Sequence, residues 1–110
     1  MAEMDKEAAE KLQELQILEG TFQNLLIQKQ NFQLELNEVK TALEEIDKSK
    51  GDIFKIIGQI MIKADKNTTK KELEEKKKLL DIRTKTLEKQ ELSLRENVER
   101  LRGDIVDKIK

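Results

Sequence analysis

The 110-residue chain is 36% hydrophobic and 41% charged, and its 22 basic residues almost cancel its 23 acidic ones. Globular domains are typically about 45–50% apolar and about 25% charged, so a large compact core is not expected. The balanced charge argues against a disordered chain and gives no basic surface for nucleic acid or an anionic membrane. The composition therefore favours long helices that pack along one face.

The side chains most often used in catalysis are missing. The chain has no histidine and no cysteine, and its four glycines are scattered rather than gathered in a phosphate-binding loop. We therefore expect no enzyme, no catalytic residue, no metal site and no cofactor. The amino terminus lacks the order of a signal peptide and no apolar run is long enough for a membrane span, which favours the cytoplasm.

An apolar repeat predicts a first helix over residues 5–50. From Leu15 to Ile46 the repeat positions are spaced alternately by three and four residues, and Lys29 is their one polar member. Such a repeat is typical of a coiled coil, because it keeps these side chains facing a partner helix. The positions are Leu15, Leu18, Phe22, Leu25, Lys29, Phe32, Leu36, Val39, Leu43 and Ile46.

A β-hairpin is predicted over residues 52–64. This segment is apolar and β-branched, and Gly58-Gln59 suits a two-residue turn of type II′. The turn would place Ile57 opposite Ile60 and Ile56 opposite Met61. Both faces of this hairpin are largely apolar and its edges are unpaired, so we expect it to associate with other hairpins.

A second helix is predicted over residues 69–109. The segment from Thr69 to Glu72 has the form of a capping box, in which the two side chains satisfy backbone N–H groups at a helix start. Leucines then recur every seven residues, at Leu73, Leu80, Leu87, Leu94 and Leu101.

The short hairpin forces the helices to run antiparallel, so positions that meet should have residue numbers with a constant sum. A sum of 119 joins the two repeats throughout; Val39 then meets Leu80 and Leu18 meets Leu101. The hairpin register sums to 117, which fits one continuous antiparallel coiled coil. For the alternate layers the second helix offers Lys76 or Lys77, Arg83 or Thr84, and Gln90 or Glu91.

Lys29 would lie beside Gln90 and Glu91 in one of these layers. A charged layer fixes the register of a coiled coil and lowers its stability. We therefore expect Lys29→Leu to raise the melting temperature.

Some apolar residues lie outside the repeat. Ile17, Ile27 and Leu34 are off the seam. Further apolar residues collect at the free ends of both helices, namely Met4, Ala8, Ala9, Leu12, Leu101, Ile105, Val106 and Ile109. They have few partners in a single helix pair, so they are candidates for contact with a client or a neighbouring subunit. The alternative is that they complete the coil or are isolated exposed side chains, which are normal on any surface.

Several short segments occur in a fixed order around the hairpin. They are residues 28–30 (Gln-Lys-Gln), residues 42–46 (Ala-Leu-Glu-Glu-Ile), Phe54-Lys55, Gly58, Arg83, and residues 87–91 (Leu-Glu-Lys-Gln-Glu). Together they resemble the beta-type subunits of the prefoldin family, which are ATP-independent holding chaperones. The single hairpin also resembles the beta type, since alpha-type subunits carry two.

The resemblance implies a mainly α fold over residues 1–110, an antiparallel two-helix coiled coil with a central β-hairpin that joins a β-barrel on oligomerisation. It implies a hexamer of two alpha and four beta subunits. By this analogy the barrel interface would be Ile53, Phe54, Ile56, Ile57, Ile60, Met61 and Ile62. The client-binding residues at the helix ends would be Met4, Leu12, Leu15, Leu101, Ile105 and Ile109.

The implied function is capture of unfolded proteins at the coiled-coil ends and their transfer to a cytosolic group II chaperonin. Neither nucleic acid nor a membrane is an expected partner. The alternative is a structural scaffold or tether that oligomerises through its hairpin and has no client. The hairpin discriminates between them, since a tether needs only a helical turn and gains nothing from apolar strands.

Overall fold

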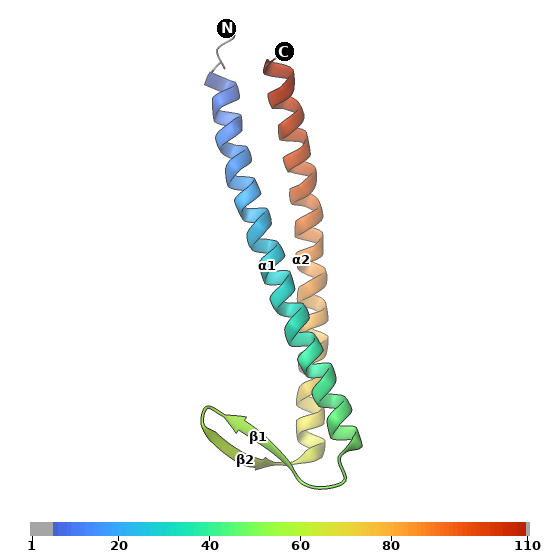
Figure 1. The fold of residues 1–110 in the computed structure, drawn as a ribbon. Coiled ribbons are helices and arrows are strands. Elements are labelled where there is room, and N and C mark those ends of the chain that lie inside the picture. The colour runs from blue at the N-terminus through green and yellow to red at the C-terminus, as the bar shows by residue number, and fades with distance from the viewer. Residues whose placement is uncertain (1–5, 110) are drawn as a thin grey trace. The chain divides into compact units, whose positions relative to one another are not determined.

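The computed structural model describes residues 6–109, which form two helices joined by a β-hairpin (Figure 1). Helix α1 covers Lys6–Lys48 and helix α2 covers Lys66–Ile109. Between them lie strand β1, Ile53–Ile57, and strand β2, Ile60–Ala64. The chain divides into two compact units, one formed by residues up to Gln30 and from Lys85 onward, the other by Asn31–Thr84.

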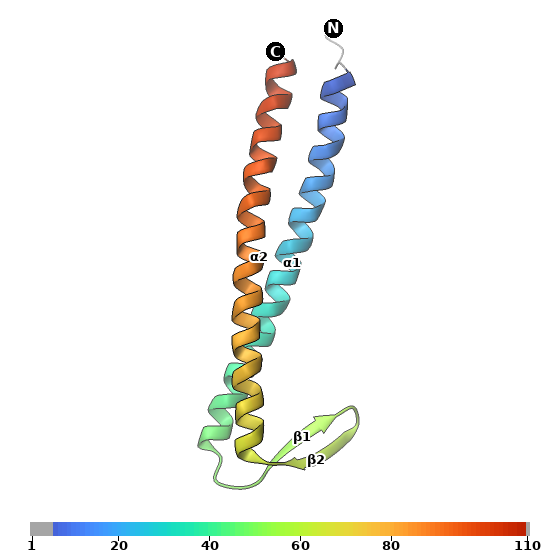
Figure 2. The same ribbon diagram turned by 180° about the vertical axis from the view of Figure 1, so that it is seen from behind.

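In each unit a stretch of α1 lies antiparallel to a stretch of α2 (Figures 1 and 2). The predicted fold class, a mainly helical antiparallel coiled coil with a central hairpin, is confirmed. The absence of proline lets each helix run without a break, because no backbone N–H is missing from its hydrogen-bond ladder.

The first unit has an apolar core between its two helical stretches. Four side chains in it are buried, namely Leu15, Val98, Leu101 and Ile105. Leu12 and Leu18 are partly buried against them. Leu18 therefore lies with Leu101, as the predicted register requires.

The second unit has a separate core of the same kind. Its buried members are Leu36, Val39 and Leu80, and partly buried side chains packed against them are Phe32, Leu43 and Leu73. Val39 lies with Leu80, which again follows the predicted register.

The alternate layers of the coiled coil contain the polar residues of α2. The sequence offered two residues for each of these layers, and in each pair one side chain is half-buried and the other is exposed. The half-buried side chains are Lys77, Thr84 and Glu91. They follow the leucines of α2 by four residues, which places them on the same side of the helix. The Thr84 hydroxyl is satisfied within the helix, because it donates to the Leu80 carbonyl at 2.8 Å.

The hairpin has the predicted register. Ile57 pairs with Ile60, Ile56 with Met61 and Phe54 with Lys63. Gly58 has a φ of +61°, and no other residue in the described part of the chain has a positive φ. A positive φ at the first central residue alone is the mark of a type II′ turn, which favours glycine there.

The start of α2 differs from the prediction. The helix begins at Lys66 rather than at residue 69, and Asp65 is its N-cap. The Asp65 carboxylate accepts a hydrogen bond from the Thr68 backbone N–H at 2.9 Å and another from the Thr68 hydroxyl at 2.8 Å. These bonds satisfy one of the free N–H groups of the first turn.

The predicted capping box does not form. Thr69 lies inside the first turn, where its N–H donates to the Asp65 carbonyl at 3.0 Å, and its hydroxyl is buried without a hydrogen-bond partner. The Glu72 carboxylate instead lies 2.6 Å from the Lys55 ammonium group of the hairpin. Asp65 directly follows the last residue of β2, so the chain enters the helix one turn earlier than the threonine motif indicates.

The N-cap makes part of the stability pH-dependent. Hydrogen bonds from the Thr68 N–H and hydroxyl lower the pKa of Asp65 below its ordinary value. A lowered pKa in the folded state means that the carboxylate stabilises the fold above its unfolded pKa of about 4. This contribution is lost as the pH falls from about 4 through the lower folded value.

We therefore expect Asp65→Ala to lower the thermal midpoint by a few degrees at pH 7, and the difference from the unaltered chain to shrink at pH 2. Asp65→Asn is the matched control, because asparagine caps helices about as well and does not titrate. Thermal unfolding followed by circular dichroism from pH 7 to pH 2 measures both. An alanine variant that differs equally at both pH values would contradict the carboxylate's role.

Candidate assembly and client-binding surfaces

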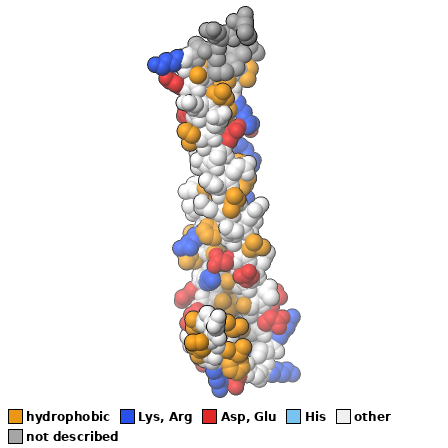
Figure 3. All heavy atoms as spheres, turned by 60° about the vertical axis from the view of Figure 1, so that its left-hand side comes forward, with side chains coloured by type: hydrophobic (Ala, Val, Ile, Leu, Met, Phe, Trp, Pro, Cys, Tyr) orange, Lys and Arg blue, Asp and Glu red, His pale blue; other side chains and the backbone are white. Residues whose placement is uncertain are grey.

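The hairpin exposes apolar side chains on both of its faces. Ile56 is 72% exposed and Met61 is 65% exposed on one face, while Ile57 is 61% exposed on the other. Figure 3 shows hydrophobic side chains gathered over the hairpin. We call this set the hairpin surface; it consists of Phe54, Ile56, Ile57, Ile60, Met61 and Ile62. Ile53, the seventh predicted interface residue, is half-buried at the base of β1.

Two exposed ion pairs hold the hairpin at its base. Lys55 pairs with Glu72 of α2 at 2.6 Å, and Lys63 of β2 pairs with Asp52 at 3.4 Å. Exposed pairs of this kind each contribute only about 0–1 kcal/mol. The first pair joins the hairpin to α2 and the second closes the base of the hairpin, while the side chains of the hairpin surface remain exposed.

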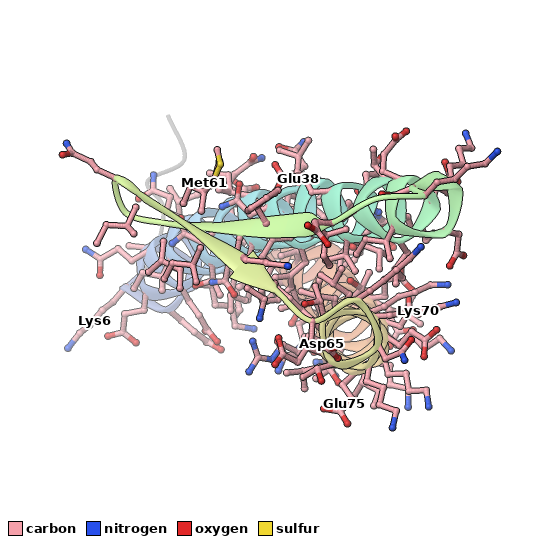
Figure 4. The ribbon with its side chains drawn as sticks, turned by 90° about the horizontal axis from the view of Figure 1, so that it is seen from below. Lys6, Glu38, Met61, Asp65, Lys70 and Glu75 are labelled. Atoms are coloured by element: carbon pink, nitrogen blue, oxygen red, sulfur yellow. The ribbon has the colours of Figure 1, made fainter. Side chains whose placement is uncertain are left out.

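The ends of α1 and α2 meet beside the hairpin and are joined by lysines. The Lys66 ammonium group donates to the Ser49 carbonyl at 2.6 Å, and Lys70 pairs with Asp47 at 2.8 Å. The hydrogen bond and the charge of Asp47 raise the pKa of Lys70. Figure 4 shows Asp65 and Lys70 around the first turns of α2, where the chain leaves the hairpin.

The predicted client-binding residues differ in accessibility. Leu15, Leu101 and Ile105 are buried in the core of the first unit, and Leu12 is half-buried beside them. Met4 and the side chain of Ile109 lie outside what the structure describes. A client can therefore reach the three buried residues only if the helices separate locally at this end.

Val106 is an exposed apolar residue at the same end. The sequence places it among the apolar residues of the free ends, but it was not one of the six residues assigned to the client site. It is 51% exposed, immediately after the buried Ile105. On a helix, consecutive side chains point about 100° apart, and here Val106 faces outward beside the buried Ile105. The direction of its side chain separates Val106 from the buried members of the same free-end set.

Charged residues continue the seam beyond the apolar core of the first unit. Lys11 and Lys108 lie seven residues from Leu18 and Leu101 along the repeat, and both are largely shielded from solvent. Lys11 lies 3.4 Å from Asp104, and Lys108 lies 2.7 Å from Glu7. Ion pairs thus join the helices in the outermost described layers, beside the buried Ala8, a feature that continuing the repeat by one heptad indicates.

Lys29 forms the predicted charged layer. Its ammonium group lies 3.2 Å from one carboxylate oxygen of Glu91, and the two side chains are only 25% and 13% exposed. Arg95 lies 3.2 Å from the other oxygen of Glu91 and stacks over the Phe22 ring at 5.7 Å from its centroid. Glu91 therefore has two cationic partners, one between the helices and one on the surface.

Residues 6–109 contain no group of three or more acidic, histidine or cysteine side chains placed to hold a metal ion. No helix within that range is long and apolar enough to cross a bilayer. The candidate sites are the hairpin surface and the free ends of the helices, and both belong to an antiparallel coiled coil with a central hairpin.

Comparison with known proteins identifies the family. A model of the prefoldin subunit family matches residues 9–110. A prefoldin subunit beta of Saccharolobus islandicus is 37% identical over 108 residues, which are 96% of this chain and 86% of that protein. One of Pyrobaculum islandicum is 37% identical over 90 residues, 80% of this chain and 72% of that protein.

A solved structure has the same fold. The crystal structure of the prefoldin beta subunit from Thermococcus strain KS-1 matches with a TM-score of 0.88 and 31% identity, covering 100% of this chain and 98% of that one. The chain belongs to the prefoldin subunit family, among its beta-type members. The resemblance drawn from the sequence is confirmed, and prefoldin subunits are chaperones rather than enzymes.

Proposed function

We propose that this chain is the beta-type subunit of a hetero-hexameric holding chaperone that works without ATP. Residues 1–110 act as one prefoldin-like domain, and the hairpin joins it to neighbouring subunits, including an alpha-type subunit, in a β-barrel. The helix ends capture unfolded proteins and release them to a group II chaperonin in the cytoplasm. No cofactor takes part.

The exposed hairpin is the observation that carries this proposal. A two-stranded hairpin alone is marginally stable in water, and this one has two apolar faces and two unpaired strand edges. The exposed fractions of the hairpin surface run from 47% to 72%. Pairing with other hairpins would cover these side chains and satisfy the free backbone groups of both edges.

The helix ends support client capture through a combination of accessible and buried apolar side chains. Val106 and the half-buried Leu12 are available while the helices are packed, and the core around Leu15 becomes available when they separate. Each contact is weak. Several subunits that contact one client supply affinity through multivalency rather than through a specific pocket.

A scaffold without a client is the second candidate. The burial of Leu15, Leu101 and Ile105 favours it, because a packed helix end has little apolar surface left for another protein. A chaperone should protect an unfolded protein from aggregation, whereas a scaffold should not.

The test uses the assembled complex with an alpha-type subunit and an aggregating client followed by light scattering. We expect Leu12→Ser with Val106→Ser to assemble normally, and about tenfold more complex to be needed for half-maximal protection, since two apolar contacts per subunit are lost. Ile105→Ser is avoided, because it would also open a cavity in the core of the first unit.

The matched control is Leu79→Ser with Leu92→Ser. These side chains are 46% and 57% exposed on α2, away from its free end. Equal protection by the end variant and the unaltered complex would exclude the helix ends as the client site. An assembled complex that gives no protection would favour the scaffold.

A further inference from the structure

Two ion pairs join α1 to α2 at the free ends of the helices, which lie side by side in Figures 1 and 2. The Lys11 ammonium group lies 3.4 Å from the Asp104 carboxylate, and the Lys108 ammonium group lies 2.7 Å from the Glu7 carboxylate. We call these two contacts the terminal ion pairs. Lys11 also lies 4.0 Å from Glu7 on its own helix, so the four charges form one network.

The two lysines of this network occupy seam positions. Lys11 lies seven residues before Leu18, and Lys108 lies seven residues after Leu101. The residue-number sum of 119 that joins Leu18 to Leu101 also joins the two lysines, so both belong to one layer of the coiled coil. Their side chains are only 26% and 27% exposed. Like charges in one layer repel, so the layer depends on the carboxylate that each lysine contacts on the opposite helix.

The terminal ion pairs directly adjoin the apolar core of the first unit. Leu12 and Ile105 follow Lys11 and Asp104 in the sequence, and both pack in that core. The buried members of the core are Leu15, Val98, Leu101 and Ile105. Ion pairs with exposed members are weak and are screened by salt, so this end of the coiled coil can separate while the rest stays packed.

We propose that the terminal ion pairs control the access of unfolded proteins to the core of the first unit. While the pairs are formed, Leu15, Leu101 and Ile105 stay covered. When the helices separate, an apolar segment of an unfolded protein takes the place of the opposite helix. Such a segment must supply enough apolar contact to offset the lost ion pairs, which folded proteins rarely expose. The inference rests on the proposed client capture and adds its regulation.

A single thiol measures whether the core is accessible, because the chain has no cysteine of its own. Val98→Cys places this thiol in the buried core with a side chain close in size. Adding Glu7→Lys with Asp104→Lys replaces both terminal ion pairs by repulsion, and the uncharged reagent N-ethylmaleimide should then modify the thiol about tenfold faster. Adding Lys11→Glu with Lys108→Glu as well exchanges all four charges. The pairs then form with opposite sense, and the rate should return close to its original value.

Ser93→Cys is the control for the reagent. Ser93 is exposed on α2 in the same unit, so its thiol should react at one rate in all three charge backgrounds. The functional readout is protection of an aggregating client by the complex with an alpha-type subunit. The repelling variant should need about threefold less complex for half-maximal protection, since apparent affinity follows the fraction of open ends while Leu12 and Val106 bind in either state. The exchanged variant should protect as the unaltered complex does.

Each result decides between readings. A Val98→Cys thiol that reacts equally in all three backgrounds would overturn the control by ion pairs. The same holds if the exchanged variant reacts as fast as the repelling one, because the pairing of charges would then be irrelevant. Faster thiol reaction with unchanged protection would mean that clients do not use the core, and the proposed function would stand as long as the unaltered complex protects. If the unaltered complex gives no protection, the proposed function fails, and the inference fails with it.

Discussion

Ile57→Thr with Ile60→Thr is expected to weaken assembly with an alpha-type subunit at least a hundredfold while the helices stay folded. These two side chains pair with each other across the hairpin end, and both are largely exposed in the single chain. Burying an isoleucine is worth about 2 kcal/mol, so exchanging two for threonine removes on the order of 3 kcal/mol per hairpin interface. Threonine keeps the β-branched shape that strands favour, so the hairpin itself should persist.

The measurement is the mass of the mixed subunits by light scattering, with circular dichroism as the check on folding. Ile82→Thr with Leu92→Thr is the matched control, because these side chains are 62% and 57% exposed but lie on α2. The control should assemble as the unaltered chain does. Equal loss in both variants would mean that general surface hydrophobicity, rather than the hairpin, drives assembly.

The features that follow from a local repeat were predictable from the sequence. The type II′ turn depends on Gly58 and its two neighbours, and the strand register follows from the turn alone. The seam depends on spacings of three and four residues, so the spacing alone assigns Val39 and Leu80 to one layer, where both side chains are buried. In each case the determining residues are close together or strictly periodic.

The start of α2 was not predictable in the same way, because two capping signals follow each other. Asp65 with Thr68, and Thr69 with Glu72, both have spacings that suit a helix start. Which of the two residues caps the helix depends on where β2 ends. The Glu72 carboxylate pairs with Lys55 of the hairpin instead of with the backbone at the helix start. The helix therefore starts at the first N-cap candidate after β2, and the second candidate lies inside its first turn.

The client-binding residues show a different limit. The repeat alone already assigns Leu15 and Leu101 to the seam, and the structure buries both. Their assignment to a client site came from their position at the helix ends. The position of a residue in the sequence shows that it lies at the free ends of the helices. Whether a client can reach it depends on the direction of its side chain. The side chain of Val106 points outward.

Lys29→Leu with Glu91→Leu is expected to raise the free energy of unfolding by about 1–3 kcal/mol, because replacing a largely buried ion pair with apolar residues is often stabilising. The two groups lie 3.2 Å apart and are mostly shielded from water, so much of their attraction is offset by lost hydration. Arg95 stays 56% exposed over Phe22 when Glu91 is removed, so no cation becomes buried without a partner. Lys29→Leu alone should raise stability less, since Glu91 then keeps only Arg95.

Urea unfolding of the isolated chain measures the change. The control is Glu35→Leu with Lys76→Leu, a pair at 3.3 Å whose side chains are 44% and 50% exposed and which should give no gain. The charged layer also fixes the register, because a shift of one heptad would separate Lys29 from Glu91 and leave two largely shielded charges without each other. The stabilised variant should therefore show more than one set of amide signals in solution, whereas a single set with lowered stability would mean that the pair itself stabilises the fold.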